Sequence, residues 1–156
     1  MNKTQDLMEH LIEMINGGIA SLPAEKVLEG IDFQYVNLKL EGFDKSIWDL
    51  LYHIAFASHD ILEFSINPDY EYKKWPEDYW PKFNCPDEPT FENAKEEIIE
   101  TEDKMNTLIK EGADLFKAFD HGKGQTLLRE AMLLAYHNAY HLGQVMVLKK
   151  YFNPTF

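Results

Sequence analysis

The sequence predicts an all-α protein, a four-helix bundle whose second and third helices are joined by a long loop rich in proline and tryptophan. Apolar residues recur every three or four positions in four segments, 4–16, 44–66, 90–111 and 125–151, which is the spacing of one helix face. We find no strand pattern, in which apolar and polar residues alternate. With 156 residues and no repeat or linker, we expect a single domain over 1–156.

The first helix is predicted at 4–16 and ends at Gly17 and Gly18, because glycine favours the left-handed turn that follows many helices. A shorter helical segment begins at Pro23, a residue whose fixed φ suits the first turn of a helix. The apolar face of the first helix consists of Leu7, Met8, Leu11, Ile12 and Ile15.

The second main helix is predicted at 44–66, with Asp44 or Ser46 as its N-cap and Asn67-Pro68 as its stop. His53 lies inside this helix, next to its apolar face. That face consists of Ile47, Leu50, Leu51, Ile54, Ala57, Ile61 and Phe64.

The loop that follows, at 67–89, contains five of the seven prolines of the chain together with Trp75 and Trp80. A connection of this length in a compact domain is usually a functional lid or a packed excursion. We interpret it as an aromatic plug that covers one end of the bundle, with a lid as the alternative. Cys85 is interpreted as a loop residue, because no histidine or basic residue flanks it closely to activate a thiol.

The third helix is predicted at 90–111, from a Thr90 N-cap to a break at Gly112. Its apolar face consists of Phe91, Ala94, Ile98, Met105, Leu108 and Ile109. Its acidic residues are predicted to form a solvated outer face: Glu92, Glu96, Glu97, Glu100, Glu102 and Asp103.

The fourth helix, at 125–151, carries His137 and His141 four residues apart. Four residues on a helix correspond to a rotation of about 40° and a rise of about 6 Å, so both imidazoles leave one face. Glu130 and Gln144 fall on the same polar line, beside an apolar stripe made of Leu127, Leu128, Ala131, Leu134, Ala135, Leu142, Val145 and Met146.

These positions predict a metal site. Helix bundles build such sites from side chains on facing helices, so His53 of the second helix is expected to meet His137 and His141 of the fourth. Neutral imidazole is a common ligand of divalent zinc, nickel and iron, and three nitrogens leave open positions for water or substrate. The alternative is that the histidines are hydrogen-bonded residues at the edge of the core.

Composition excludes several partners. The formal net charge is −12, from 27 acidic and 15 basic residues, whereas a nucleic-acid-binding protein needs a cationic face. No apolar run approaches the roughly 20 residues that span a bilayer, so we expect no nucleic acid and no membrane partner. The start of the chain shows no signal-sequence pattern. A single cysteine, Cys85, forms no internal disulfide and fits a cytoplasmic location.

Two well-known metal motifs do not match. Zinc proteases with an HxxxH spacing need glutamate directly after the first histidine, where this chain has Asn138. Di-iron bundles use Glu-x-x-His motifs, and Asn138 again stands three residues before His141 in place of the glutamate.

The run WDLLYHIA at 48–55 is followed far downstream by HNAYHLGQV at 137–145. These two motifs resemble the DinB-like (YfiT-type) family of metal-binding proteins, and the resemblance covers most of the chain in helix order and length. It implies a four-helix bundle with a three-histidine divalent-metal site at His53, His137 and His141, and a homodimer. Family members of known activity are S-transferases or isomerases that use bacillithiol, mycothiol or a related low-molecular-weight thiol.

Two functions remain open from the sequence. In the first, the metal lowers the pKa of a bound low-molecular-weight thiol, which then attacks a small electrophile; a hydrolase is less favoured because no residue is a clear general base. In the second, the protein is a non-catalytic, dimeric metal- or ligand-binding protein in a stress response. The side chains expected to orient the histidines are Asp49, Glu130, Asn138 and Gln144, with surface groups that have no role as the alternative for each. The expected polar neighbours of the substrate are Tyr52, Tyr136 and Tyr140.

Overall fold

The protein is all-helical, as the sequence predicts. The computed structural model describes residues 3–18 and 20–153, so the ends of the predicted domain 1–156 lie outside the described residues. The elements in chain order are α1 (Lys3–Ile15), α2 (Ala24–Leu28), the 3-10 helix η1 (Phe33–Tyr35), α3 (Ile47–Ile66), α4 (Glu88–Lys110) and α5 (Leu127–Phe152). Pairing between extended segments in this part of the chain is limited to two isolated bridges. Of the helices described, none is long and apolar enough to cross a membrane.

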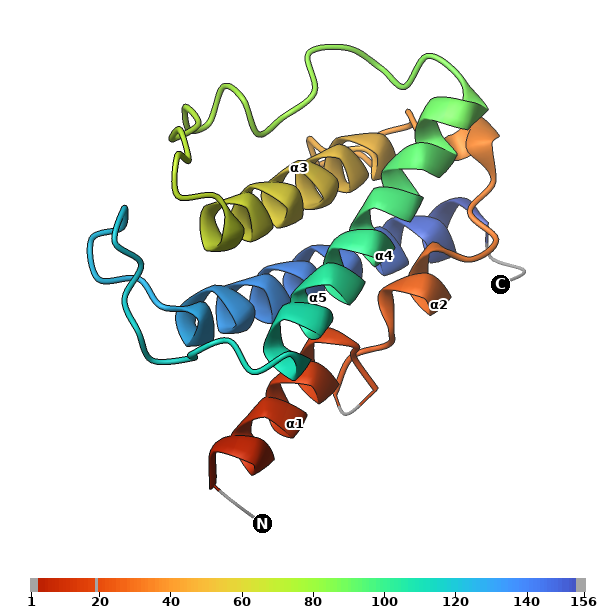
Figure 1. Cartoon of the computed structure of the whole chain (residues 1–156). Coiled ribbons are helices and arrows are strands. Elements are labelled where there is room, and N and C mark those ends of the chain that lie inside the picture. The colour runs from red at the N-terminus through yellow and green to blue at the C-terminus, as the bar shows by residue number, and fades with distance from the viewer. Residues whose placement is uncertain (1–2, 19, 154–156) are drawn as a thin grey trace.

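The long loop is a crossover connection that runs along the bundle. α3 and α4 begin at the same end of the molecule, whereas α5 runs in the opposite direction (Figure 1). The chain therefore has to return along the whole of α3, which at 20 residues is about 30 Å long. The interpretation of this segment as a plug over one end is wrong, because the loop follows the flank of α3 and supplies one wall of the pocket described below.

Contacts along α3 confirm the direction of the loop. The Tyr70 hydroxyl donates to Asp60 in the second half of α3. Further along the loop, the Trp48 indole at the start of α3 donates to the Phe83 carbonyl. Cys85 is buried near the end of the loop, where its backbone N–H donates to Asn37; burial raises the pKa of its thiol, which fits a loop residue and not a nucleophile.

A buried polar layer divides the core into two apolar clusters. One cluster joins the first half of α3, including Leu51 and Ile54, to the C-terminal half of α5. The other joins the second half of α3, including Ile61 and Leu62, to α1 and to the N-terminal half of α5. The polar layer between them contains the buried side chains of Ser58, Thr101, Glu102 and Asn138. Each large apolar side chain buried in these clusters contributes about 1.5–3 kcal/mol.

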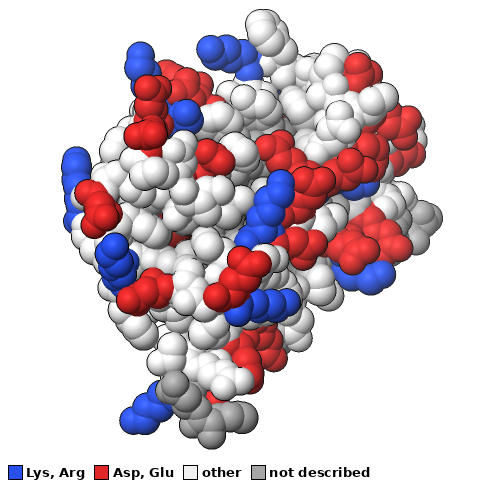
Figure 2. Space-filling view, viewed as in Figure 1, with Lys and Arg blue, Asp and Glu red and all other residues white. Residues whose placement is uncertain are grey.

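The outer face of α4 is acidic, as the sequence predicts, at all but one of the expected positions. Glu96, Glu100 and Asp103 are exposed, and acidic side chains gather over α4 in Figure 2, with basic side chains between them. Glu102 is the exception. It is 7% exposed, because it lies on the core side, four residues after Ile98 and three before Met105.

Side-chain caps decide where the helices begin. Ser46 caps α3 in a reciprocal capping box: its hydroxyl accepts from the Asp49 N–H at 3.1 Å, and Asp49 accepts from the Ser46 N–H at 2.9 Å. The predicted Thr90 N-cap of α4 is wrong. Asp87 takes this role, since proline is tolerated in the first turn and α4 already begins at Glu88.

Replacement of Ser46 by alanine tests the start of the helix that carries His53. Ser46→Ala removes the acceptor for one N–H of the first turn, so the free energy of unfolding should fall by about 1 kcal/mol. Urea denaturation followed by circular dichroism measures this loss. Asp44→Ala is the matched control, since Asp44 is 86% exposed, and it should change stability by less than about 0.5 kcal/mol. Equal losses in both variants would contradict the assigned cap.

Candidate metal centre

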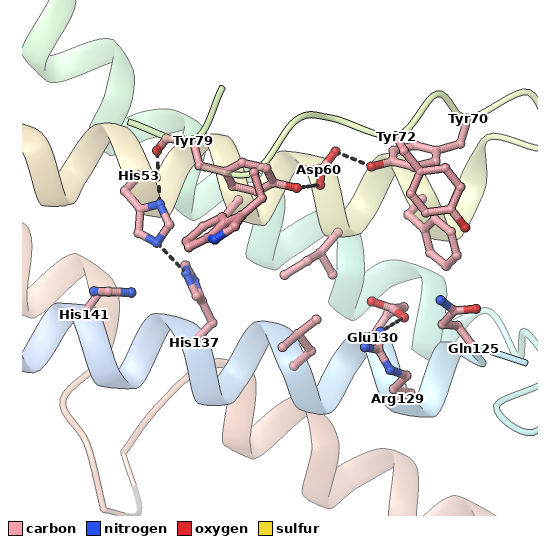
Figure 3. Close-up of a pocket in the computed structure, with 15 residues that line it drawn as sticks. His53, Asp60, Tyr70, Tyr72, Tyr79, Gln125, Arg129, Glu130, His137 and His141 are labelled. Atoms are coloured by element: carbon pink, nitrogen blue, oxygen red, sulfur yellow. Dashed lines mark hydrogen bonds and ion pairs between the residues drawn. The ribbon is translucent and has the colours of Figure 1, made fainter. Parts of the chain in front are cut away.

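Three histidines from two antiparallel helices meet in one cluster. His53 lies in the first half of α3, and His137 and His141 lie one turn apart in α5. Each ring offers one nitrogen, and the three nitrogens lie within 4.8 Å of one another. Nε2 of His53 and Nε2 of His137 are 3.0 Å apart (Figure 3). The structure thus brings together the three residues that the sequence singles out.

Hydrogen-bond partners favour one proton position in each imidazole ring. In every ring Nδ1 faces an oxygen: the Tyr79 carbonyl for His53 at 3.1 Å, Asn138 Oδ1 for His137 at 3.3 Å, and Gln144 Oε1 for His141 at 2.8 Å. A neutral imidazole has one N–H, and an oxygen acceptor draws that N–H to its side. These partners favour Nδ1 as the donor in all three rings, and a ring in that tautomer has its lone pair on Nε2.

When both rings carry the proton on Nδ1, the Nε2 lone pairs of His53 and His137, 3.0 Å apart, repel each other unless a positive charge lies near both. Burial lowers the pKa of His53 and of His137 from 6.5 to about 4, and burial also lowers the pKa of His141. At neutral pH the rings are therefore neutral, which is the form that binds metal ions.

The cluster fits a divalent metal ion. A tetrahedral zinc ion, with Zn–N distances of about 2.0–2.1 Å, holds its ligand nitrogens roughly 3.3–3.4 Å apart. The Nε2 atoms of His53 and His137 are 3.0 Å apart, and all three ligand nitrogens lie within 4.8 Å of one another. The separation expected around zinc falls between these two distances. Three imidazoles suit zinc, nickel or ferrous iron, and they leave a coordination position open for another ligand.

The loop between α3 and α4 covers the outer side of His53. The Trp80 ring stacks on the His53 ring with centroids 4.1 Å apart and planes at 9°. The Lys45 ammonium lies 4.2 Å from the centroid of the Trp80 ring. Sequence reasoning missed Trp80 and the Tyr79 carbonyl, because periodicity does not encode the register of a loop against a helix.

Asp60 fastens this loop to α3. It accepts hydrogen bonds from the Tyr70 hydroxyl at 2.7 Å and from the Tyr79 hydroxyl at 2.5 Å. Burial and the Asp60 carboxylate raise the pKa of both tyrosines, so both hydroxyls keep their protons. Tyr79 is thereby held at two points, by its hydroxyl on Asp60 and by its carbonyl on His53. Asp60 lies two turns after His53 on the same face of α3, and this spacing was the signal in the sequence that could have identified it.

Behind His137, a buried network reaches through α5 to α4. The Asn138 amide donates to Glu102 Oε1 at 2.9 Å, and its oxygen accepts from the Ser58 hydroxyl at 2.9 Å. The carboxylate thus determines which way the amide points, and the amide oxygen is left facing His137. Asn138 is therefore an orienting residue, as the sequence predicts, whereas Glu102 was wrongly assigned to the surface. Burial raises the pKa of Glu102 from 4.5 to about 7.

The other expected orienting residues fall into two groups. Gln144 contacts His141 as predicted. Asp49 does not contact His53, because it is engaged in the cap of α3 and in an ion pair with Lys39. Glu130 is buried and pairs with Arg129, two turns from His137.

The tyrosines expected near the substrate lie outside the pocket. Tyr52 stacks on Phe56 on another side of α3, and Tyr136 and Tyr140 are exposed on α5. Only Tyr140 approaches the cluster, with its ring 4.8 Å from that of His141. The tyrosines that line the pocket come from the loop: Tyr70, Tyr72 and Tyr79.

The three histidines line one end of a pocket of about 360 Å³ between α3, α5 and the loop (Figure 3). This volume is far larger than the roughly 30 Å³ that one water molecule takes up in the liquid. The open side of the cluster therefore faces a space that admits a small organic molecule.

Comparison with known proteins assigns the family. The sequence model of the DinB superfamily matches residues 4–145, which include all three histidines. The chain belongs to the DinB superfamily. No curated protein and no solved structure matches the chain.

The raised pKa of Glu102 predicts a pH dependence of stability. The folded protein binds more protons than the unfolded chain between the ordinary pKa of 4.5 and the folded value of about 7, so the contribution of Glu102 to stability is largest below this window and falls as the pH rises through it. Glu102→Gln does not titrate. From pH 5 to pH 8, metal-free wild type should lose on the order of 2 kcal/mol relative to Glu102→Gln, measured by urea denaturation. The histidines are present in both proteins and cancel in the difference, so parallel pH profiles would contradict the prediction.

Proposed function

We propose that the chain binds one divalent metal ion at His53, His137 and His141, and that it uses the ion to activate a low-molecular-weight thiol for transfer to a small electrophile. The observation that carries the proposal is the convergence of three imidazole nitrogens on one end of a pocket. Membership of the DinB superfamily supports it.

When bound, a divalent ion lowers the pKa of a coordinated thiol toward or below neutrality. The thiol proton would pass to solvent through the open side of the pocket. The sulfur lone pair would then form a bond to an electrophilic carbon, and the bond from that carbon to its leaving group would break with the electron pair on the leaving group.

Several side chains around the histidines support the proposed metal site. The acceptors Tyr79, Asn138 and Gln144 hold the three Nδ1–H groups, which keeps each Nε2 available and raises its basicity. Trp80 covers one side of His53 and limits the access of water there. Among the described residues that line the pocket, the carboxylates are Asp60 and Glu130. Asp60 is engaged by two hydroxyls and Glu130 lies two turns from His137, so thiol transfer is favoured over hydrolysis by a carboxylate base.

Metal content tests the site. Tag-free protein purified without chelator should contain close to one divalent ion per chain by mass spectrometry. His53→Ala and His137→Ala should each contain less than about a tenth of this amount, because two ligands hold an ion far more weakly than three. Both variants should stay helical by circular dichroism, since the two core clusters do not depend on the ion. His59→Ala is the matched control, because His59 is exposed on the same helix. Wild-type metal content in both ligand variants would contradict the assignment.

An experiment with cobalt-substituted protein distinguishes the thiol-transferase hypothesis from the hypothesis of a non-catalytic metal-binding protein. Addition of β-mercaptoethanol should produce a sulfur-to-cobalt charge-transfer band, and a bromoalkane should then be consumed at a rate that depends on the metal. A cobalt spectrum that does not change when the thiol is added would contradict the transferase hypothesis. That outcome would favour the non-catalytic metal-binding protein.

We also propose that the chain is one domain and forms a homodimer through α5. A stripe of exposed apolar residues follows one face of this helix: Met132, Tyr136, Tyr140, Val147 and Tyr151. Gly143 falls in the same stripe near its midpoint, and the space where its Cβ would lie is open. An antiparallel pairing of α5 with its copy about Gly143 allows close approach and covers the whole stripe, as an isologous two-fold interface requires.

Charge placed in the stripe tests the dimer. Wild type should sediment as a dimer, and the double variant Tyr136→Glu/Val147→Glu should sediment as a monomer at the same concentration, because four buried charges in the two-fold interface are unpaired. Phe116→Glu, at an exposed apolar residue outside α5, is the control and should remain dimeric. A monomeric wild type would contradict this part of the proposal and leave the metal site untouched.

A further inference from the structure

The pocket continues well beyond the histidines. It follows α5 for two turns from His137 to Glu130 (Figure 3), a rise of about 10 Å. Its apolar lining includes Ile61 and Leu133 from the helices and Trp75 from the loop. The proposed thiol chemistry takes place at the histidine end, so the far end is available for another part of a bound molecule.

The far end presents buried carboxylates. The Glu130 side chain is 3% exposed, and Asp60 is 9% exposed as a residue; they line the same pocket from α5 and α3. One basic residue, Arg129, also lines this end of the pocket beside Glu130 (Figure 3), although the cationic side chains here extend toward water. Arg129, which pairs with Glu130, is 57% exposed, and Lys123 is exposed with its ammonium 5.9 Å from the centroid of the Tyr72 ring.

The charge of these two carboxylates is only partly balanced. Arg129 pairs with Glu130, whereas the hydrogen-bond partners of Asp60 are the neutral hydroxyls of Tyr70 and Tyr79. Burial raises the pKa of Glu130, Arg129 partly opposes this rise, and the charge of Asp60 adds a smaller upward contribution. A cation that enters between the two helices would be stabilised by both carboxylates, away from the screening of bulk water.

We propose that the far end binds a primary ammonium group, so that the pocket takes a ligand whose metal-binding atom and ammonium are separated by an apolar chain of about 10 Å. A compact ammonium has three donors in different directions, which suits oxygen acceptors arriving from α3, α5 and the loop. A guanidinium is planar and suits one carboxylate in a single plane. This inference rests on the proposed function, because it uses the metal as the anchor of the other end.

Three thiols of equal chain length test the proposal: aminohexanethiol, hexanethiol and mercaptohexanoic acid. Each is titrated into cobalt-substituted protein, and the charge-transfer band reports the dissociation constant. Aminohexanethiol should bind about tenfold more tightly than either of the other two thiols. Its ammonium gains one charge-assisted hydrogen bond, and the free energy of one such bond corresponds to a difference in affinity of about this size. Glu130→Gln should remove this preference, and Glu130→Asp should retain part of it. Glu96→Gln, the same substitution at an exposed site of α4, should leave it unchanged.

Calorimetry of the metal-free protein with hexylamine and with hexanoate gives a readout that needs neither metal nor thiol. Binding of hexylamine alone, lost in Glu130→Gln, is expected. Equal affinity for all three thiols, or a preference for mercaptohexanoic acid, would overturn the inference and leave the metal proposal intact. If no thiol changes the cobalt spectrum but hexylamine still binds, the proposed function fails and the ammonium site stands.

Discussion

The antiparallel packing of α3 against α5 is the interaction on which the rest of the structure depends. Leu51 and Ile54 of α3 share one buried cluster with Leu142 and Val145 of α5, and this contact sets the register between the helices. Because α-helices are stiff over two turns, the same register places His53 opposite the histidine pair of α5. It also sets Asp60 and Glu130 along one pocket. A shift of one turn would remove both arrangements.

The parallel arrangement of α3 and α4 has a second consequence. A short turn joins only antiparallel neighbours, so a parallel pair needs a crossover that returns along the bundle. Here the crossover at 67–87 carries the aromatic residues that wall the pocket, and Asp60 fastens it through Tyr70 and Tyr79. The length of the loop and the shape of the site therefore have one cause, the direction of α4.

The histidines are oriented by groups from three parts of the chain: a loop carbonyl, an amide of α5 that Glu102 of α4 holds in place, and a glutamine one turn along α5. Burial of polar groups is costly unless each finds a partner. The polar layer between the two core clusters meets this requirement at Ser58, Asn138 and Glu102. Rigid support of this kind is what a metal site needs, because ligand geometry tolerates only small displacements.

The helices and the metal-ligand candidates could be predicted from the sequence, because helical periodicity and the four-residue spacing of His137 and His141 are local properties of the chain. Capping chemistry predicted Asp44 or Ser46 as the N-cap of α3, and the structure shows that it is Ser46. The neighbours of these elements could not be predicted in this way, because they depend on how the helices pack. Glu102 looked like a member of an acidic surface until its place between α4 and α5 was known, and Trp80 has no signal in periodicity. Which loop atom contacts which helix depends on packing between segments distant in sequence, and that packing is set by the direction and register of whole helices.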